Sequence, residues 1–337
     1  QDRIGGRICT VERNGYRIEA GAEFIHGRAP EIFELVERFG LKTTEVEGET
    51  YCNLGDGLKV CDFFEEVDQV FDKLKRYTGP DKSFEEFVRE SCEQESTRQW
   101  ARGYVAGFHG APPELAGVAG LIDDTLAEER IDGERSWRIH AGYGALVDAM
   151  WQCCERQGVL LRTSSPVTAV RWADAIEVEC GSESYRARRA IVTLPLSDLQ
   201  AASVTFDPPL TAKQKPLQQL AMGTVARCTL VFKRPFWREL HGLDGHELGD
   251  VSFMFSRGED FPTWWTQAPA DVPILTAWAS SITALGLTGQ PNDVVTDRAL
   301  QSLQAITGIT MESLKQEFVS AVWHDWHSNP WVRGAYS

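Results

Sequence analysis

The sequence predicts an α+β fold, within the wider α/β group, in which a mixed β-sheet is backed by helices. Chain length, one long helical stretch and the strand patterns around it lead to this prediction. At 337 residues the chain is long enough for two domains and a large core. Residues 62–132 show helical periodicity that no strand interrupts, whereas the segments on either side alternate apolar with polar side chains.

The first elements follow from local start and stop signals. Pro30 can begin a helix whose apolar face continues until Gly40 stops it. Residues 49–60 are typical of a β-hairpin with glycines at its turn. We therefore expect a surface helix followed by a short hairpin before the chain becomes helical.

The helical stretch from Asp62 carries one apolar stripe, as a helix packed on a core should. Ser83 and Glu86 have the spacing of a capping box, which predicts a helix start at this point. The acidic residues of the first helix are expected to face solvent, and they are Glu65, Glu66, Asp68 and Asp72.

The second half is predicted to alternate strands with helices. One helix is expected over residues 145–157, stopped by Gly158, and another through Val295 and Ile306, ended by Gly308. In the helix over residues 145–157, the side chains expected to point into the core are Leu146, Val147, Met150 and Trp151. Strands are expected over residues 159–162, 167–172, 176–180, 188–194, 228–233 and 274–278.

Composition limits the partners. The net charge of −15 argues against nucleic acid and anionic membranes, because their phosphates would be repelled, and it is compatible with cationic small molecules. No apolar run approaches the roughly 20 residues of a membrane span. Composition therefore indicates an ordinary soluble globular protein with neither nucleic acid nor a membrane as partner.

The cysteine pattern contains no C-x-x-C and suggests neither a zinc site nor a disulfide framework. We expect reduced core cysteines and a cytoplasmic protein. His324 and His327 bracket Asp325, and a structural role is favoured over a metal site, so no metal is predicted. The eight cysteines are Cys9, Cys52, Cys61, Cys92, Cys153, Cys154, Cys180 and Cys228.

Two glycine motifs flank a predicted hairpin at the start of the chain. Gly5-Gly6-Arg7, expected to follow a helix, offers bare backbone N–H groups and a guanidinium, which suit a diphosphate. Gly21-Ala22 would let backbone lie flat against a ring, and Phe24 and His26 follow at alternating positions. Glycine pairs alone are a weak signal, since turns use them widely.

The segment GGRICTVERNGYRIEAGAEFIHG resembles the FAD-dependent amine oxidase family, which includes monoamine, polyamine and spermine oxidases. Further motifs recur in the family's order, ending with WHSNPWVRGAYS at 326–337. The resemblance implies a discontinuous FAD-binding domain, formed by residues 1–48, 138–198 and 326–337. It assigns residues 49–137 and 199–325 to a substrate-binding domain with a mixed sheet.

The family's G-x-G-x-x-G unit would precede Gly5, and its last FAD segment would follow Ser337. Neither motif is in the sequence, which is expected to be an internal fragment or a chain without the adenylate end of the cofactor site. Gly142-Tyr143-Gly144 lacks the third glycine and is interpreted as ordinary packing.

The resemblance implies non-covalent FAD, because Ala335 stands where monoamine oxidases carry the cysteine that tethers the flavin. Trp326 matches the tryptophan that packs against the flavin. Val167 matches an adenine contact, although a plain strand valine is the simpler interpretation. The remaining predicted cofactor contacts are Gly5, Gly6 and Arg7 at the diphosphate and Gly21 and Ala22 at the isoalloxazine.

Tyr336 matches an aromatic residue that flanks the substrate nitrogen, and Phe24 would line the same cavity. His26 matches the histidine of a WIHG motif in spermine oxidase-like members. Arg227 stands where family oxidases usually carry a lysine near flavin N5, with Lys233 further along at an exposed strand end. Since arginine stays charged and planar, we hypothesise that Arg227 binds an anionic group such as a substrate carboxylate.

The implied activity is oxidation of an amine by FAD, with hydride transfer, imine hydrolysis and reoxidation by oxygen to hydrogen peroxide. One alternative is a chain that cannot hold FAD and serves as a binding module. A less favoured alternative is a flavin desaturase or protoporphyrinogen oxidase-like enzyme. Flavin colour in the purified protein separates the first two, and an amine panel with peroxide detection separates the first from the third.

Overall fold

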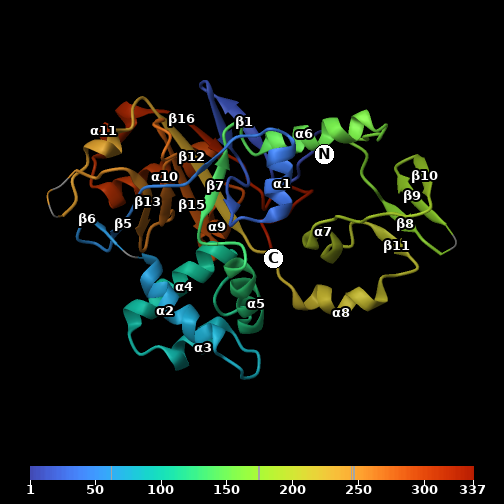
Figure 1. Cartoon of the computed structure of the whole chain (residues 1–337), viewed down its shortest axis with the longest axis horizontal. Coiled ribbons are helices and arrows are strands. Elements are labelled where there is room, and N and C mark those ends of the chain that lie inside the picture. Colours follow the sequence, from blue (N-terminus) through green and yellow to red (C-terminus); the bar gives the residue numbers. More distant parts are fainter. Residues whose placement is uncertain (62, 174, 244, 246) are drawn as a thin grey trace.

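The computed structural model describes residues 1–61, 63–173, 175–243, 245 and 247–337. Figure 1 shows a large sheet with helices on one side of the molecule, a cluster of helices beneath it, and a smaller sheet at the opposite end. The described part contains helices and mixed sheets, so the predicted fold class is confirmed. None of the helices that it describes is both long and apolar enough to cross a membrane.

A seven-stranded sheet forms the main core, in the order β16-β12-β15-β14-β13-β5-β6. β13 pairs with β5 in parallel, while the other neighbours are antiparallel, so the sheet is mixed as predicted. Every residue of β12 is buried. The strands are β5 (Glu49–Asn53), β6 (Leu58–Val60), β12 (Val225–Phe232), β13 (Val251–Ser256), β14 (Thr263–Trp265), β15 (Ile274–Ser280) and β16 (Phe318–Trp323).

Helix α10 (Asn292–Thr307) packs on this sheet with its apolar stripe inward. Its predicted stripe residues Val295 and Ile306 are buried, and Gly308 ends it in the left-handed conformation, as the sequence indicates. Shorter helical pieces complete the layer, namely η1 (Phe236–Glu239), α9 (Ser281–Leu287) and α11 (Met311–Glu317).

The helical stretch folds into α2 (Phe63–Lys75), α3 (Phe84–Ser91), α4 (Glu95–His109) and α5 (Val118–Glu129). The predicted capping box is present, with both Ser83 and Glu86 bonded to backbone N–H groups. Asp62 lies outside the described residues. Glu66 differs from the prediction of a solvated side chain, because it accepts a hydrogen bond from Thr97 at 2.8 Å and is half-buried.

The N-terminal segment begins with turns rather than the expected helix and continues as a hairpin of β1 (Thr10–Arg13) and β2 (Tyr16–Glu19). β3 (Ile25–His26) and β4 (Thr43–Glu45) flank β7 (Ser136–Ile139) in a small sheet. Two helices lie beside it, α1 (Pro30–Arg38) and α6 (Gly144–Arg156), close to their predicted positions. Met150 of α6 is 43% exposed, so its predicted inward position is wrong.

A four-stranded sheet at the far end joins β8 (Ala169–Arg171), β9 (Ile176–Cys180), β10 (Glu183–Ala187) and β11 (Thr205–Asp207), with α7 (Leu196–Gln200) and α8 (Thr211–Gln219) nearby (Figure 1). The strands predicted at 159–162 and 188–194 are not formed. Both segments run outside this sheet, and no strand of the described chain lies along them to supply hydrogen-bond partners. Leu160 and Ile191 are consequently 78% and 92% exposed.

The prediction that all cysteines are reduced is wrong for one pair. Cys52 and Cys61 form a disulfide that ties β5 to the residue after β6. The spacing gave no signal for it, because the hairpin turn, and not a sequence motif, brings the two side chains together. The other six cysteines are free.

Candidate functional site

A cavity of about 2210 Å³ lies where the N-terminal segment, the α2–α5 helices, the seven-stranded sheet and the C-terminal residues meet. Gly5, Gly6 and Val167 do not line this cavity. Most of the residues that the motifs single out do line it, namely Arg7, Gly21, Ala22, Phe24, His26, Arg227, Trp326 and Tyr336.

The two ends of the chain are joined at this cavity by hydrogen bonds. Trp326 Nε1 donates to the Ala20 carbonyl at 2.7 Å, and Arg7 donates to the Ala335 carbonyl. The N–H of Gly223, just before β12, donates to the Tyr336 carbonyl at 2.6 Å. The first motif and the last one, over 300 residues apart in sequence, therefore form one wall.

Gly21 occupies a position where no side chain fits. A Cβ atom there would lie 1.9 Å from the Arg7 carbonyl oxygen and 3.1 Å from the Trp326 ring. Gly21 is therefore required by the packing of the Arg7 backbone and the Trp326 ring, and its own backbone lines the cavity together with that of Ala22. Bare backbone beside an indole is a surface against which a flat ring can lie.

Three of the predicted cofactor contacts lie outside the cavity. Val167 precedes β8 in the small sheet at the far end of the molecule. Gly5 and Gly6 form a turn closed by Arg3, whose guanidinium donates to the Gly6 carbonyl at 2.6 Å and to the Ile8 carbonyl at 3.0 Å. Gly6 has open space beside it. These three residues stay predicted contacts outside the cavity.

A buried ion-pair network lies directly behind Gly21. Glu23 is bonded to Arg227 and, at 2.5 Å, to Arg138 of β7. Trp265 Nε1 and Gln267 Nε2 each donate to Glu23 at 3.1 Å. Burial raises the pKa of the Glu23 carboxyl, but the two guanidinium groups outweigh it and lower this pKa to about 2.

Arg227 consequently has an anionic partner within the protein. Its guanidinium also donates to the Gly21 carbonyl at 2.9 Å and stacks over the Trp265 ring at 5.5 Å. The structure favours Glu23 over a substrate carboxylate as the anionic partner of Arg227, because Glu23 already occupies this place. Nothing in the sequence pattern marked Glu23, since its partners come from strands far along the chain.

Aromatic side chains form much of the remaining wall. Phe24 lies 5.5 Å from Trp265, and Tyr104 stacks on Phe108 at 5.0 Å between ring centroids. Burial raises the pKa of the Tyr336 hydroxyl, which therefore stays neutral. The sequence analysis identified Tyr336 and Phe24, whereas it missed the cavity-lining rings of Trp265, Trp278, Phe253, Tyr104 and Phe108.

His26 lies in the cavity between the edges of the Phe24 and Phe108 rings, at 5.7 and 5.4 Å. Its Nδ1 is 3.2 Å from the Ser136 hydroxyl. Solvent reaches the ring from the cavity, while the surrounding protein lowers the pKa of His26 by burial. The lowered pKa favours the neutral imidazole at pH 7.

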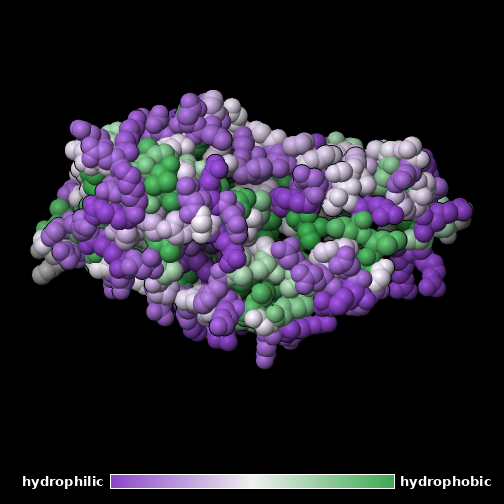
Figure 2. Space-filling model, turned by 90° about the horizontal axis from the view of Figure 1, so that it is seen from above, coloured by the Kyte–Doolittle hydropathy of each residue, from purple (hydrophilic) through white to green (hydrophobic). Residues whose placement is uncertain are grey.

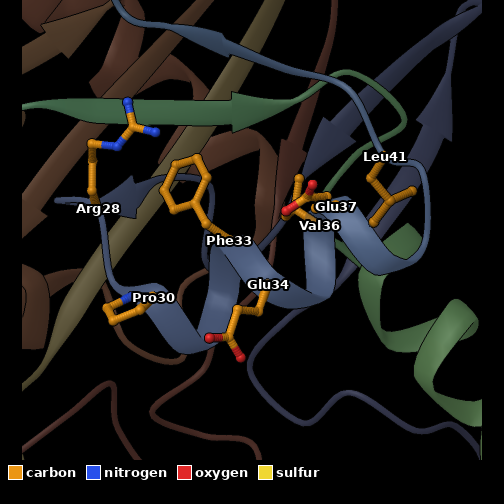
Figure 3. A pocket seen from close by; sticks show the side chains of 7 residues that line it. All are labelled: Arg28, Pro30, Phe33, Glu34, Val36, Glu37 and Leu41. Atoms are coloured by element: carbon orange, nitrogen blue, oxygen red, sulfur yellow. The ribbon is translucent and has the colours of Figure 1, made fainter.

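A smaller hollow of about 560 Å³ lies over α1 (Figure 3). Arg28 is one of its lining residues, with its guanidinium 5.3 Å from the Phe33 ring and 5.7 Å from the Trp137 ring. None of its lining residues is a predicted site residue. Its few polar groups do not converge on a point, so we place the functional site in the larger cavity.

The described residues include no group of three or more His, Cys, Asp or Glu side chains that could hold a metal. His324 packs edge-on to Trp326 with ring centroids 4.3 Å apart, and Asn329 Nδ2 lies 3.2 Å from its Nε2. His327 Nδ1 is 3.1 Å from the Thr224 hydroxyl. Both histidines support the wall that carries Trp326.

Comparison with known proteins gives the family. A family model for flavin containing amine oxidoreductases matches residues 1–337. Human peroxisomal N(1)-acetyl-spermine/spermidine oxidase is 24% identical over 395 residues, covering 99% of this chain and 76% of that protein. Putrescine oxidase of Kocuria rosea is also 24% identical, covering 100% of this chain and 78% of that protein.

Solved structures show the same fold. Wild-type putrescine oxidase bound to putrescine superposes with a TM-score of 0.79 at 22% identity, covering 100% of this chain and 80% of that one. Cyclohexylamine oxidase from Brevibacterium oxydans IH-35A gives a TM-score of 0.79 at 19% identity, covering 99% and 79%. Because the family model spans the whole sequence, the chain belongs to the flavin containing amine oxidoreductases and is an oxidoreductase whose cofactor is FAD.

Proposed function

We propose that the protein oxidises a small amine in the large cavity, next to non-covalently bound FAD. The observation that supports this most is the wall in which Gly21, Trp326 and Tyr336 lie together, with no room for a side chain at Gly21. FAD, when bound, supplies the acceptor for the hydride that leaves the amine α-carbon. The isoalloxazine would be held by the bare backbone of Gly21 and Ala22 and by the Trp326 indole.

The protein's own task is to orient an uncharged amine and to keep water away from it. Tyr336 and Phe24 would supply aromatic surface for the substrate, because both line the cavity. His26 is neutral there because burial lowers its pKa, so it adds no positive charge that would repel a cationic amine as it enters. The product imine is hydrolysed to an aldehyde and ammonia or a shorter amine, and oxygen is reduced to hydrogen peroxide.

Arg227 distinguishes this site from the lysine-containing oxidases that the sequence resembles. Arginine differs from lysine in its planar guanidinium, which here is paired with the Glu23 carboxylate. We propose that Arg227 controls the reactivity of the reduced cofactor with oxygen through its charge. Replacement by lysine should change the rate of reoxidation, and an unchanged rate would exclude this role.

The relatives indicate the class of amine to test first. One is named for acetylated spermine and spermidine, another for putrescine, and a structural neighbour for cyclohexylamine. We propose a small mono- or polyamine. The division into an FAD-binding and a substrate-binding part, at the boundaries given above, also stays a proposal.

The test uses the purified chain, titrated with FAD and then mixed with putrescine, acetylated spermidine and cyclohexylamine under air. Bound flavin with peroxide release from at least one amine is the expected result. A chain that takes up no FAD would instead be a binding module, and one that binds FAD yet oxidises no amine would favour a desaturase-like enzyme. A catalase-treated sample controls for peroxide from other sources.

We propose the cytoplasm as the compartment. Six of the eight cysteines are free, as expected there, whereas Cys52 and Cys61 are paired. Structural disulfides are rare in reducing compartments. One relative is named as peroxisomal. Fractionation of cells that express the chain, with thiol labelling before lysis, would locate it and report the state of the pair together.

A further inference from the structure

Glu23 links three parts of the cavity wall through a single carboxylate. One oxygen accepts from Arg138 Nε at 2.5 Å and from Gln267 Nε2 at 3.1 Å. The other accepts from Arg227 and from Trp265 Nε1 at 3.1 Å. Only 3% of the Glu23 side chain and 4% of the Arg227 side chain are exposed. The carboxylate is therefore fully hydrogen-bonded and shielded from water.

The two arginines carry the network to the backbone around it. Arg227 donates to the Gly21 carbonyl at 2.9 Å, so the ion pair fixes the orientation of the Gly21 peptide group. This is the position at which no side chain fits. Arg138 donates to the Thr266 and Ala268 carbonyls, both at 2.9 Å. Glu23 thus holds the N-terminal segment, β7, β12 and the residues after β14 in one geometry.

The charges at this place are shared among four side chains. The Arg138 and Arg227 guanidinium groups face the Glu23 carboxylate, and the Glu19 carboxyl is close enough to Arg227 to interact with it electrostatically. Removing a single partner of a buried ion pair changes the local charge by one unit in a medium of low dielectric constant. A ring bound at Gly21 would experience that change directly.

We propose that Glu23 is a positioning residue, which holds Arg227 against the Gly21 carbonyl and sets how much positive charge the cavity presents to the bound flavin. This inference rests on the proposed function, because it requires FAD to bind at Gly21. It adds a residue, and a role in tuning the reduction potential, that neither the motifs nor the comparisons assign.

The test compares Glu23→Gln with Arg227→Gln in the FAD-loaded chain. Positive charge favours the reduced, more negative flavin, so Glu23→Gln should raise the flavin midpoint potential and Arg227→Gln should lower it. Both variants should bind FAD more weakly, by about tenfold, because the Gly21 peptide loses its fixed orientation. A purely structural role would move both potentials in one direction or neither.

Glu85 provides a matched control. It is also a buried glutamate between two arginines, Arg102 at 2.7 Å and Arg89 at 2.5 Å, and it does not line the cavity. Glu85→Gln should lower thermal stability and leave the midpoint potential unchanged. An equal shift of the potential in this variant would overturn the proposal.

The outcomes separate this inference from the proposed function. Wild-type protein that binds no FAD overturns both. Wild-type protein that binds FAD, with variants whose potentials do not move in opposite directions, overturns only the role of Glu23. If Glu23→Gln does not fold, Arg227→Gln decides the matter, because it leaves Glu23 paired with Arg138. An unchanged potential in that variant rejects the proposal.

Discussion

Gly21 is the residue whose replacement the structure tolerates least at the site. We expect Gly21→Ala to lower the free energy of unfolding by about 1–3 kcal/mol, because its Cβ would overlap the Arg7 carbonyl oxygen and the backbone must shift. The same shift should weaken FAD binding. Urea unfolding and titration with FAD measure the two effects.

Gly286 gives the matched control for this substitution. It lies in α9, away from the cavity, with no atom within 4 Å of an added Cβ. Gly286→Ala should be neutral or stabilising by up to about 1 kcal/mol, since alanine favours a helix. If Gly21→Ala bound FAD as tightly as the parent, the ring would not lie against this peptide.

Glu128, on the cavity side of α5, should make stability depend on pH. Burial and the Asp124 carboxylate raise its pKa to about 7, whereas an unfolded glutamate titrates near ~4.3. The folded chain therefore holds a proton that the unfolded chain has lost, and stability should fall as pH rises from about 4.5 to 7.

Glu128→Gln should remove this penalty. We expect it to be more stable than the parent by on the order of 1 kcal/mol at pH 8, after allowance for solvent screening, and nearly equal at pH 4.5. Glu129→Gln is the control, because Glu129 pairs with Lys75 at 2.7 Å and should gain nothing. Parallel stability curves for Glu128→Gln and the parent would refute the assignment.

Elements whose signals are local were predicted well from the sequence. The helix from Pro30, the capping box of Ser83 and the helix end at Gly308 depend only on neighbouring residues. The strands expected at 159–162 and 188–194 did not form, because a strand needs a partner along its edge and periodicity cannot show whether one exists.

The β5–β6 hairpin should depend on its disulfide. Cys52 and Cys61 are nine residues apart, and the loop-entropy relation gives roughly 2–3 kcal/mol for a bridge of that length. We expect the Cys52→Ser/Cys61→Ser variant to lose about that much unfolding free energy. Under non-reducing conditions the denatured parent should expose six thiols.

Cys180→Ser, in a different sheet, controls for the loss of a cysteine that is not bridged. It should change stability little and lower the thiol count by one. Eight reactive thiols in the denatured parent would mean that the two sulfurs are not bonded, and the cysteine prediction made from the sequence would then hold.

At the scale of the molecule, the site is assembled from parts that the sequence keeps far apart. Gly21, Arg227 and Tyr336 come from the start, the middle and the end of the chain, and they share one cavity. Local periodicity carries no information on such convergence, and the resemblance of the motifs supplied it. The resemblance did not indicate the Glu23 network either, because the four partners of Glu23 are set by the strand register around β7, β12 and β14.

The far end of the molecule should determine its behaviour in solution. Figure 2 shows hydrophobic surface on the side that carries β8–β11. The segments 159–161 and 191–192 contain exposed apolar side chains, and the most exposed of them are Leu160 and Ile191. Exposed apolar segments without a partner strand favour self-association, despite a net charge of −15.

We therefore expect the chain to bind a hydrophobic dye and to associate at micromolar concentration. Ile191→Lys should reduce both effects, because it places a charge where no partner strand covers the side chain. Ile282 on α9 is 72% exposed and lies outside these segments, so Ile282→Lys is the control and should change association less. Sedimentation velocity measures the association of both variants. Equal effects of the two lysines would mean that net charge, and not the exposed apolar segments, governs association.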